Sequence, residues 1–171
     1  MPAWRARGVE PVGWFSNPNI QPSSELSLRA ESMRRFARVA GLALLVPEGG
    51  PPRGWERWAA GLADAGGDKR CRECLRLRLD ATARAAATLG FRRFSTTLTV
   101  SPYQRHDLIV QAGEAAAGAH GVKFLYLDAR PQFRDSHAES RRLDLYRQAY
   151  CGCAASKWEA WDQKLARRRA G

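Results

Sequence analysis

The fold is defined by one stretch, Val122-Lys123-Phe124-Leu125-Tyr126-Leu127, which Asp128 follows directly. A short and mostly apolar run of this kind is typical of a strand buried inside a parallel sheet. A second run, Leu42 to Val46, is wholly apolar and ends at Pro47. Both stretches therefore predict buried strands, and the first of them delivers a carboxylate at its C-terminal end.

Strand-like and helix-like patterns alternate along the rest of the chain. Further strands are expected at 12–15 and 94–100, and helices around 24–40, 55–62, 75–89, 108–112, 143–149 and 158–165. Such alternation predicts an α/β fold, a parallel sheet with helices on both faces. Ligands of these sheets bind outside the carboxyl ends of the strands. Ser16-Asn17, the turn at 97–103 and Asp128 all follow predicted strands, so we expect three loops to meet at one site.

The composition is that of a folded, basic protein. The chain has 171 residues, of which 44% are hydrophobic, and its six tryptophans argue against disorder. We expect a single α/β domain over 1–171, with a core at 12–156 and a basic C-terminal helix or tail at 157–171. The formal net charge of +11 favours a polyanionic partner, with RNA or DNA ahead of a membrane. A bias towards arginine codons would explain the choice of Arg over Lys, but not the excess of basic over acidic residues.

Four cysteines occur in two close pairs, Cys71 with Cys74 and Cys151 with Cys153. A pair separated by one glycine suits an internal disulfide poorly, and shared binding of a metal suits it better. The C-x-x-C pair can face one centre from the junction of a loop and a helix, a spacing that zinc and iron–sulfur clusters both use. The alternative is four reduced thiols without a common role. We expect a cytoplasmic, reducing location, where cysteine clusters indicate metal binding or catalysis more often than disulfides.

Four motifs occur in order between about residues 12 and 156. They are Phe15-Ser16-Asn17-Pro18-Asn19-Ile20-Gln21-Pro22, Arg70-Cys71-Arg72-Glu73-Cys74, Ser95-Thr96-Thr97-Leu98-Thr99-Val100-Ser101-Pro102-Tyr103 and Tyr146-Arg147-Gln148-Ala149-Tyr150-Cys151-Gly152-Cys153. Together they resemble the QueH type of epoxyqueuosine reductase. The combination is specific, because four such motifs in register are hard to obtain by chance.

That resemblance implies an enzyme that removes the epoxide oxygen of epoxyqueuosine at the wobble position of certain tRNAs, which gives queuosine. Family members look like nucleotide-binding (HUP or Rossmann-like) α/β domains that carry a 4Fe-4S cluster beside a second, mononuclear iron; a disulfide bond is also among the expected features. The implied partners are the tRNA substrate and an electron donor, with no membrane and no DNA. By carry-over, the metal ligands would be four cysteines and one aspartate: Cys71, Cys74, Cys151, Cys153 and Asp128.

The sequence departs from the family at its start. Relatives begin with a strand that leads to a Cys-Cys-x-Pro-Cys motif and a helix, whereas no cysteine precedes Cys71 here. We therefore expect the first strand of the sheet to be missing and the second, mononuclear iron site to be incomplete. Four cysteines can hold one cluster but cannot also supply a thiolate-rich second site. The expectations are a longer natural chain or a truncated, inactive one.

Further roles are expected from the chemistry of the reaction. Removing an epoxide oxygen needs two electrons and a Lewis acid or proton for that oxygen, so we expect catalytic roles for Asp128 and Tyr103. Asp128 can equally cap the turn that follows it, and Tyr146 is expected in the core. The arginines expected to contact RNA are Arg105, Arg147 and Arg167.

Two rival functions stay open on sequence grounds. One is an RNA-binding module in which zinc binds the four cysteines in a closed tetrahedral site. The other is a folded but inactive remnant. The sequence has no Gly-rich loop of the P-loop or dinucleotide type, so neither ATP nor NAD is indicated. The histidines lie far apart in the sequence and are expected to be structural or exposed: His106, His120 and His137.

Overall fold

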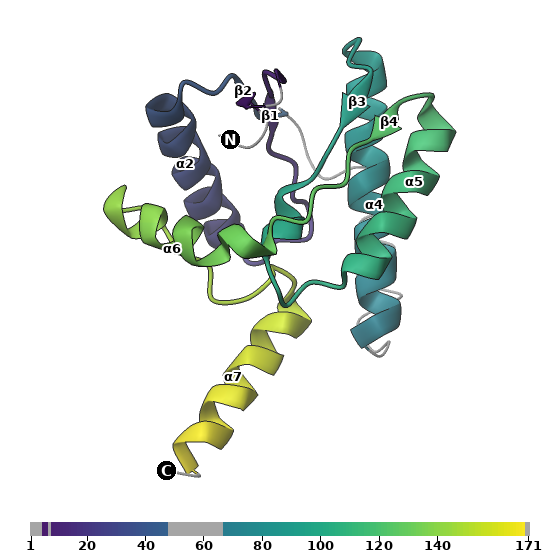
Figure 1. Ribbon diagram of the computed structural model, residues 1–171. Coiled ribbons are helices and arrows are strands. Elements are labelled where there is room, and N and C mark those ends of the chain that lie inside the picture. The colour runs from purple at the N-terminus through teal and green to yellow at the C-terminus, as the bar shows by residue number, and fades with distance from the viewer. Residues whose placement is uncertain (1–4, 7, 48–66, 170–171) are drawn as a thin grey trace. The chain divides into compact units, whose positions relative to one another are not determined.

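The computed structural model describes residues 5–6, 8–47 and 67–169 (Figure 1). The chain divides into two compact units: unit 1 comprises 1–50 and 140–171, and unit 2 comprises 51–139. Helices and short parallel strands make up both units, so the expected α/β class is confirmed.

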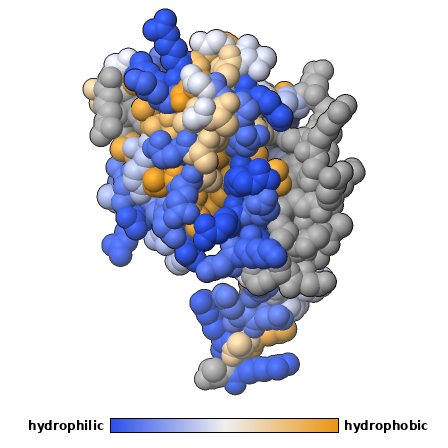
Figure 2. All heavy atoms as spheres, turned by 90° about the vertical axis from the view of Figure 1, so that its right-hand side faces the viewer, coloured by the Kyte–Doolittle hydropathy of each residue, from blue (hydrophilic) through white to orange (hydrophobic). Residues whose placement is uncertain are grey.

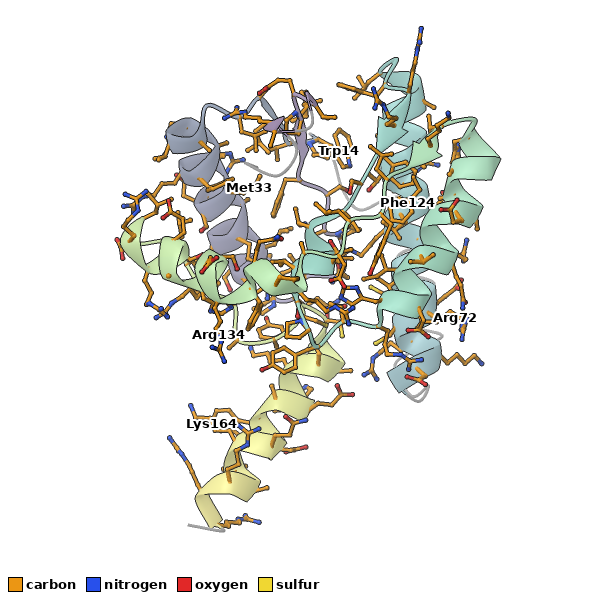
Figure 3. All side chains as sticks on the ribbon, in the orientation of Figure 1. Trp14, Met33, Arg72, Phe124, Arg134 and Lys164 are labelled. Carbon is orange, nitrogen blue, oxygen red and sulfur yellow. The ribbon has the colours of Figure 1, made fainter. Side chains whose placement is uncertain are left out.

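Unit 1 contains a short pair of parallel strands. Its elements are β1 (Gly13–Trp14), α2 (Ser23–Ala40), β2 (Leu44–Leu45) and α7 (Ala154–Arg169). Gly13 lies opposite Leu44 in the pair, and a Cβ at Gly13 would be 3.0 Å from Leu44 Cδ1 and 3.4 Å from Met33 Cε of α2 (Figure 3). Gly41 caps the C-terminus of α2 with a left-handed backbone (φ 57°). The lack of a side chain at Gly13 thus lets β1 approach both β2 and α2 closely.

Unit 2 contains a second pair of parallel strands and most of the apolar core. Its elements are α4 (Gly67–Thr88), β3 (Arg93–Phe94), η1 (Thr97–Val100), α5 (His106–His120), β4 (Lys123–Phe124) and η2 (Arg130–Gln132). β3 and β4 pair with Arg93 opposite Lys123, and α4 packs along α5. A Cβ at Gly113 of α5 would overlap the ring of Phe124, so this glycine provides the space that the ring occupies (Figure 3).

The core of unit 2 draws apolar side chains from α4, α5 and both strands. Leu79 and Ile109 are the largest side chains that are almost wholly buried. The cluster consists of Leu75, Leu79, Ala83, Ala86, Phe94, Leu108, Ile109, Ala116, Ala117, Val122 and Phe124. The runs at 75–89 and 122–127 therefore supply buried side chains as their patterns predicted.

Three local predictions are wrong. The stretch 94–100 is extended only at its start, because Thr96 Oγ1 accepts the backbone N–H of Leu98 and caps the 3₁₀ turn η1. No helix forms at 143–149, whereas α6 (Phe133–Arg142) occupies a stretch expected to be a loop and continues from unit 2 into unit 1. The C-x-x-C pair lies inside α4 rather than at a loop–helix junction. The helix expected at 55–62 lies outside the described residues.

One face of the protein is shown by the hydropathy of its residues in Figure 2. Figure 2 shows charged and polar side chains over much of one face, with apolar atoms visible between them. Among the described residues, no helix has the length and apolar character needed to cross a membrane.

Candidate functional site

Cys151 and Cys153 lie side by side in unit 1. Their Sγ atoms are 3.9 Å apart, and neither forms a disulfide. Gly152 between them has φ 129°, a backbone conformation that residues with a side chain rarely adopt. The hydrogen bond with Cys153, together with desolvation, raises the pKa of the Cys151 thiol. The glycine therefore allows the backbone to turn so that both sulfur atoms lie close together.

The beginning of α7 holds both sulfur atoms. The Ser156 backbone N–H donates to Cys153 Sγ at 3.4 Å, and the Cys151 thiol donates to Ser156 Oγ at 3.0 Å. Ser156 Oγ in turn donates to the Cys153 carbonyl at 2.8 Å. The positive end of a helix dipole favours a thiolate over a thiol. The start of α7 therefore favours negative charge beside Cys153, whereas Cys151 is held as a thiol that donates to Ser156.

The Asn-Pro-Asn loop supports the cysteine loop. The Gln21 N–H donates to the Gly152 carbonyl at 2.8 Å, and the Tyr150 hydroxyl donates to the Gln21 carbonyl. Asn19 is buried in the same place, with 3% of its surface exposed. Hydrogen bonds thus join two motifs that are about 130 residues apart in the sequence.

Arg29 of α2 clamps the segment that precedes Cys153. Its guanidinium donates to the Tyr150 carbonyl at 3.0 Å, to the Cys151 carbonyl at 3.1 Å and to Gln148 Oε1 at 2.5 Å. The guanidinium also lies 5.2 Å from the centroid of the Tyr150 ring. These hydrogen bonds satisfy backbone carbonyls of an irregular segment. Those carbonyls therefore do not need the N–H groups of a helix as partners.

Glu25 completes the clamp. Its carboxylate pairs with Arg29 Nε at 2.8 Å, and both side chains are about nine-tenths buried. Burial raises the pKa of Glu25, but hydrogen bonds from Tyr146 and Arg29 outweigh this effect and hold the pKa below its usual value. Tyr146 Oη donates to Glu25 Oε2 at 2.6 Å, while 40% of the tyrosine is exposed. The expected core role of Tyr146 is therefore wrong, and its hydroxyl anchors the cysteine segment to α2.

Sequence reasoning missed Glu25 and Arg29. Both stand four residues apart on α2, a spacing that usually indicates an exposed ion pair. The useful signal was their position beside the apolar stripe of Ala30 and Ala37, since charged residues bordering a buried stripe need partners from elsewhere in the fold.

Gly152→Ala tests the geometry of the cysteine loop. We expect a loss of about 1–3 kcal/mol in stability, because the positive φ is strained for alanine and its Cβ would lie 2.9 Å from Ile20 Cγ1. Gly118→Ala is the matched control, since Gly118 lies within α5 and a methyl group there would meet no other part of the protein within 4 Å. That substitution should stabilise by about 0.5–1 kcal/mol. Chemical denaturation measures both, and equal effects would contradict the assignment.

Cys71 and Cys74 lie on α4 in unit 2. Their positions are three apart along the helix, so both belong to one helical face. Both are half-buried and form no disulfide. Within either unit, the described residues bring no three His, Cys, Asp or Glu side chains together for a metal. The structure thus places each predicted pair on one local surface, and the four-cysteine cluster remains a prediction.

Asp128 caps the turn after β4. Its carboxylate accepts the Arg130 backbone N–H at 3.1 Å and pairs with the Arg130 guanidinium at 2.5 Å. The side-chain hydrogen bond from Arg130, with the backbone hydrogen bond next, lowers the pKa of Asp128 to about 2. Capping, one of the two expected roles, is therefore observed, and the carboxylate stays charged throughout the neutral range. Tyr103, the other expected catalytic residue, is 85% exposed and stacks edge-on with Phe133 at 6.0 Å.

A pair of variants separates the two roles of Asp128. If this carboxylate binds iron, Asp128→Asn should lower iron content and turnover by more than about 10-fold, because the amide carries no charge. Arg130→Ala removes the same side-chain pairing but leaves the carboxylate, so it should retain both. Similar, small effects of the two variants would leave Asp128 as a turn cap alone.

The three arginines expected to contact RNA differ in their surroundings. Arg105 pairs with Asp68 at 2.5 Å and with Asp107 at 3.0 Å, and these carboxylates raise the pKa of its guanidinium. Arg147 and Arg167 are exposed, the first in the irregular segment before the cysteines and the second on α7. Arg105 would have to exchange protein carboxylates for phosphate, which makes it the least available of the three.

Cys151 and Cys153 fit a metal by the chemistry of their donor set. Two thiolates bound at about 2.3 Å to one tetrahedral ion are about 3.8 Å apart, close to the separation observed here. The Ser156 N–H at the start of α7 donates to one of the two sulfur atoms. The separation of the sulfur atoms is therefore compatible with two ligands of one metal ion.

The chain is similar to known proteins over most of its length. The sequence pattern of the family described as epoxyqueuosine reductase QueH matches residues 1–159. The epoxyqueuosine reductase QueH of Dehalococcoides mccartyi is 38% identical over 156 residues, which cover 91% of this chain and 84% of that protein. The Thermotoga maritima protein of the same name is 34% identical, with 91% of this chain and 85% of that one covered. The Helicobacter pylori protein is 34% identical, and the match covers 42% of its length.

The chain is basic, has an α/β fold with paired thiols, and is similar to these reductases. By class it is therefore an oxidoreductase that acts in tRNA modification. The chain belongs to the epoxyqueuosine reductase QueH family.

Proposed function

We propose that this chain reduces epoxyqueuosine in tRNA to queuosine, a step of queuosine biosynthesis. Family membership over 159 of 171 residues is the observation that carries the proposal. The preformed pair of thiols at Cys151 and Cys153 supports it, because a reductive deoxygenation requires a redox-active group beside the substrate. The formal charge of +11 supports a polyanionic substrate such as tRNA.

The reaction balances as a two-electron, two-proton reduction. Both C–O bonds of the epoxide break, a C=C bond forms between the two carbons, and the oxygen leaves as water. A proposed external reductant supplies the two electrons one at a time. The water needs two protons, which solvent or a positioned hydroxyl such as that of Tyr103 can deliver.

The residues proposed to hold an iron–sulfur cluster are Cys71, Cys74, Cys151 and Cys153. When bound, such a cluster passes electrons singly, and a neighbouring iron polarises an oxygen as a Lewis acid. Asp128 is the proposed carboxylate ligand of that second iron. Arg29 and Gly152 hold the Cys151–Cys153 loop in its observed shape, so the chain itself fixes the positions of two of the sulfur atoms.

Anaerobic reconstitution tests the proposal directly. The full chain is loaded with iron and sulfide, its iron and sulfide contents and visible absorption are measured, and it is then assayed on epoxyqueuosine-containing tRNA with a chemical reductant. We expect a coloured, iron-loaded protein that converts epoxyqueuosine to queuosine. Tight zinc binding without iron uptake would reject the cluster, and an iron-loaded protein without turnover would reject the activity of this chain.

A further inference from the structure

α7 carries an aromatic face that its own unit leaves exposed. Trp158 is 67% exposed and Trp161 is 57% exposed, and no residue of the helix is buried. Each residue turns an α-helix by about 100°, so Trp158, Trp161 and Leu165 fall within an arc of about 60°. Large apolar side chains gathered on one exposed strip usually mark an interaction surface.

A row of cations runs along one edge of this aromatic face. Lys157 precedes Trp161 by four residues, and Lys164 and Arg168 follow it by three and seven residues. These spacings place all three cations on the strip of the helix beside Trp161. Figure 3 shows the side chain of Lys164 extending outward from α7. Arg167, which was expected to contact RNA, falls on the other side of the same helix and so lies outside this face. The chain thus presents two indole rings beside three positive charges.

We propose that this face of α7 binds single-stranded RNA of the tRNA substrate, with bases stacked on Trp158 and Trp161 and phosphates bound by Lys157, Lys164 and Arg168. The inference rests on the proposed function for its choice of substrate. Aromatic platforms beside cations are how proteins hold unpaired bases without reading their sequence.

Charge and position favour RNA over other occupants. α7 carries Lys157, Lys164 and three consecutive arginines from 167 to 169 against two acidic residues, Glu159 and Asp162. The family match ends at residue 159, so most of this face lies beyond the part shared with the family pattern. Figure 2 shows mostly hydrophilic side chains on the visible side of α7, with a few apolar atoms between them. The face would therefore add tRNA affinity outside the catalytic region.

The test compares tRNA binding by four forms of the full, reconstituted chain. These are the wild type, Trp158→Ala with Trp161→Ala, Arg168→Glu, and Arg167→Glu as the control. Both arginine variants change net charge equally on one helix, so only the face differs. A fluorescein-labelled, unmodified tRNA transcript is titrated at several salt concentrations, and circular dichroism checks that helicity is retained.

We expect the double tryptophan variant to bind at least about 5-fold more weakly, since each stacked base is worth about 5- to 150-fold in affinity. Arg168→Glu should lower the slope of log K against log salt by about 1, and Arg167→Glu should change it less.

Four results would overturn the inference. If both face variants bind tRNA like the Arg167→Glu control, α7 is not an RNA surface, and the proposed function is unaffected. The inference fails in the same way if they lose only binding to anionic phospholipid vesicles, or if sedimentation shows that they dissociate a dimer without affecting tRNA binding. If the wild-type chain binds no tRNA at all, the proposed function fails together with this inference.

Discussion

Cys153→Ser is expected to lower epoxyqueuosine reduction by more than about 100-fold, because even the residues that only orient metal ligands contribute about 10- to 100-fold. Serine has nearly the shape of cysteine and can still accept the Ser156 N–H, so the beginning of α7 should keep its structure. Its hydroxyl is a poor ligand for iron, which prefers thiolates in such clusters. The variant should therefore be folded, poorly loaded with iron and nearly inactive.

Ser156→Ala is the control for the cysteine variant. It removes the hydroxyl that accepts the Cys151 thiol but leaves both sulfur atoms in place. Iron content and turnover, measured after identical reconstitution, should fall far less than in Cys153→Ser. A Cys153→Ser protein that retains full iron and turnover would show that this sulfur binds no metal.

Arg29→Ala is expected to cost about 3–5 kcal/mol of stability, because it leaves the buried Glu25 carboxylate without its partner and releases two backbone carbonyls. In a protein of this size such a loss lowers the melting temperature by about 6–20 °C. The Cys151–Cys153 loop should also become more reactive towards thiol reagents, since Arg29 binds the carbonyls on its N-terminal side. Calorimetry and the rate of thiol labelling measure the two effects.

Arg34→Ala provides the comparison on the same helix. Arg34 pairs with Glu31 at 3.7 Å, and both side chains are exposed to about half or more. Exposed pairs contribute about 0.2–1 kcal/mol, so this variant should be close to wild type. Replacing both members of the buried pair, with Glu25→Gln added to Arg29→Ala, should recover part of the lost stability. An Arg29→Ala protein as stable as Arg34→Ala would contradict the clamp.

The sequence predicted those parts of the fold that depend on local pattern. The apolar run at 122–127 lies in unit 2 with Val122 and Phe124 in the core, and Gly41 ends α2 as its position indicated. The helix at 143–149 was predicted because Leu143, Tyr146 and Ala149 have helical spacing, but it does not form. Asp144 has φ 50° there, and the carbonyls that follow bind Arg29 instead of helical N–H groups.

The sequence predicted the proximity of two cysteines in the candidate site, but not the contacts that hold their loop. Cys151 and Cys153 were recognisable from their spacing, and their proximity is confirmed. The contacts of Arg29 and Gln21 with that loop join residues more than 100 positions apart, which no periodicity or propensity encodes. Local patterns specify which atoms can bind a metal, whereas tertiary contacts specify how they are held.

The discontinuous course of unit 1 has a consequence for biosynthesis. Unit 2 is one continuous segment, whereas unit 1 combines residues 1–50 with 140–171. During translation, residues 1–50 of unit 1 are therefore made first, and Arg29 has no partners from residues 140–171 while unit 2 is made and folds. The loop with Cys151 and Cys153 can therefore bind Arg29 only after the whole of unit 2 has been synthesised.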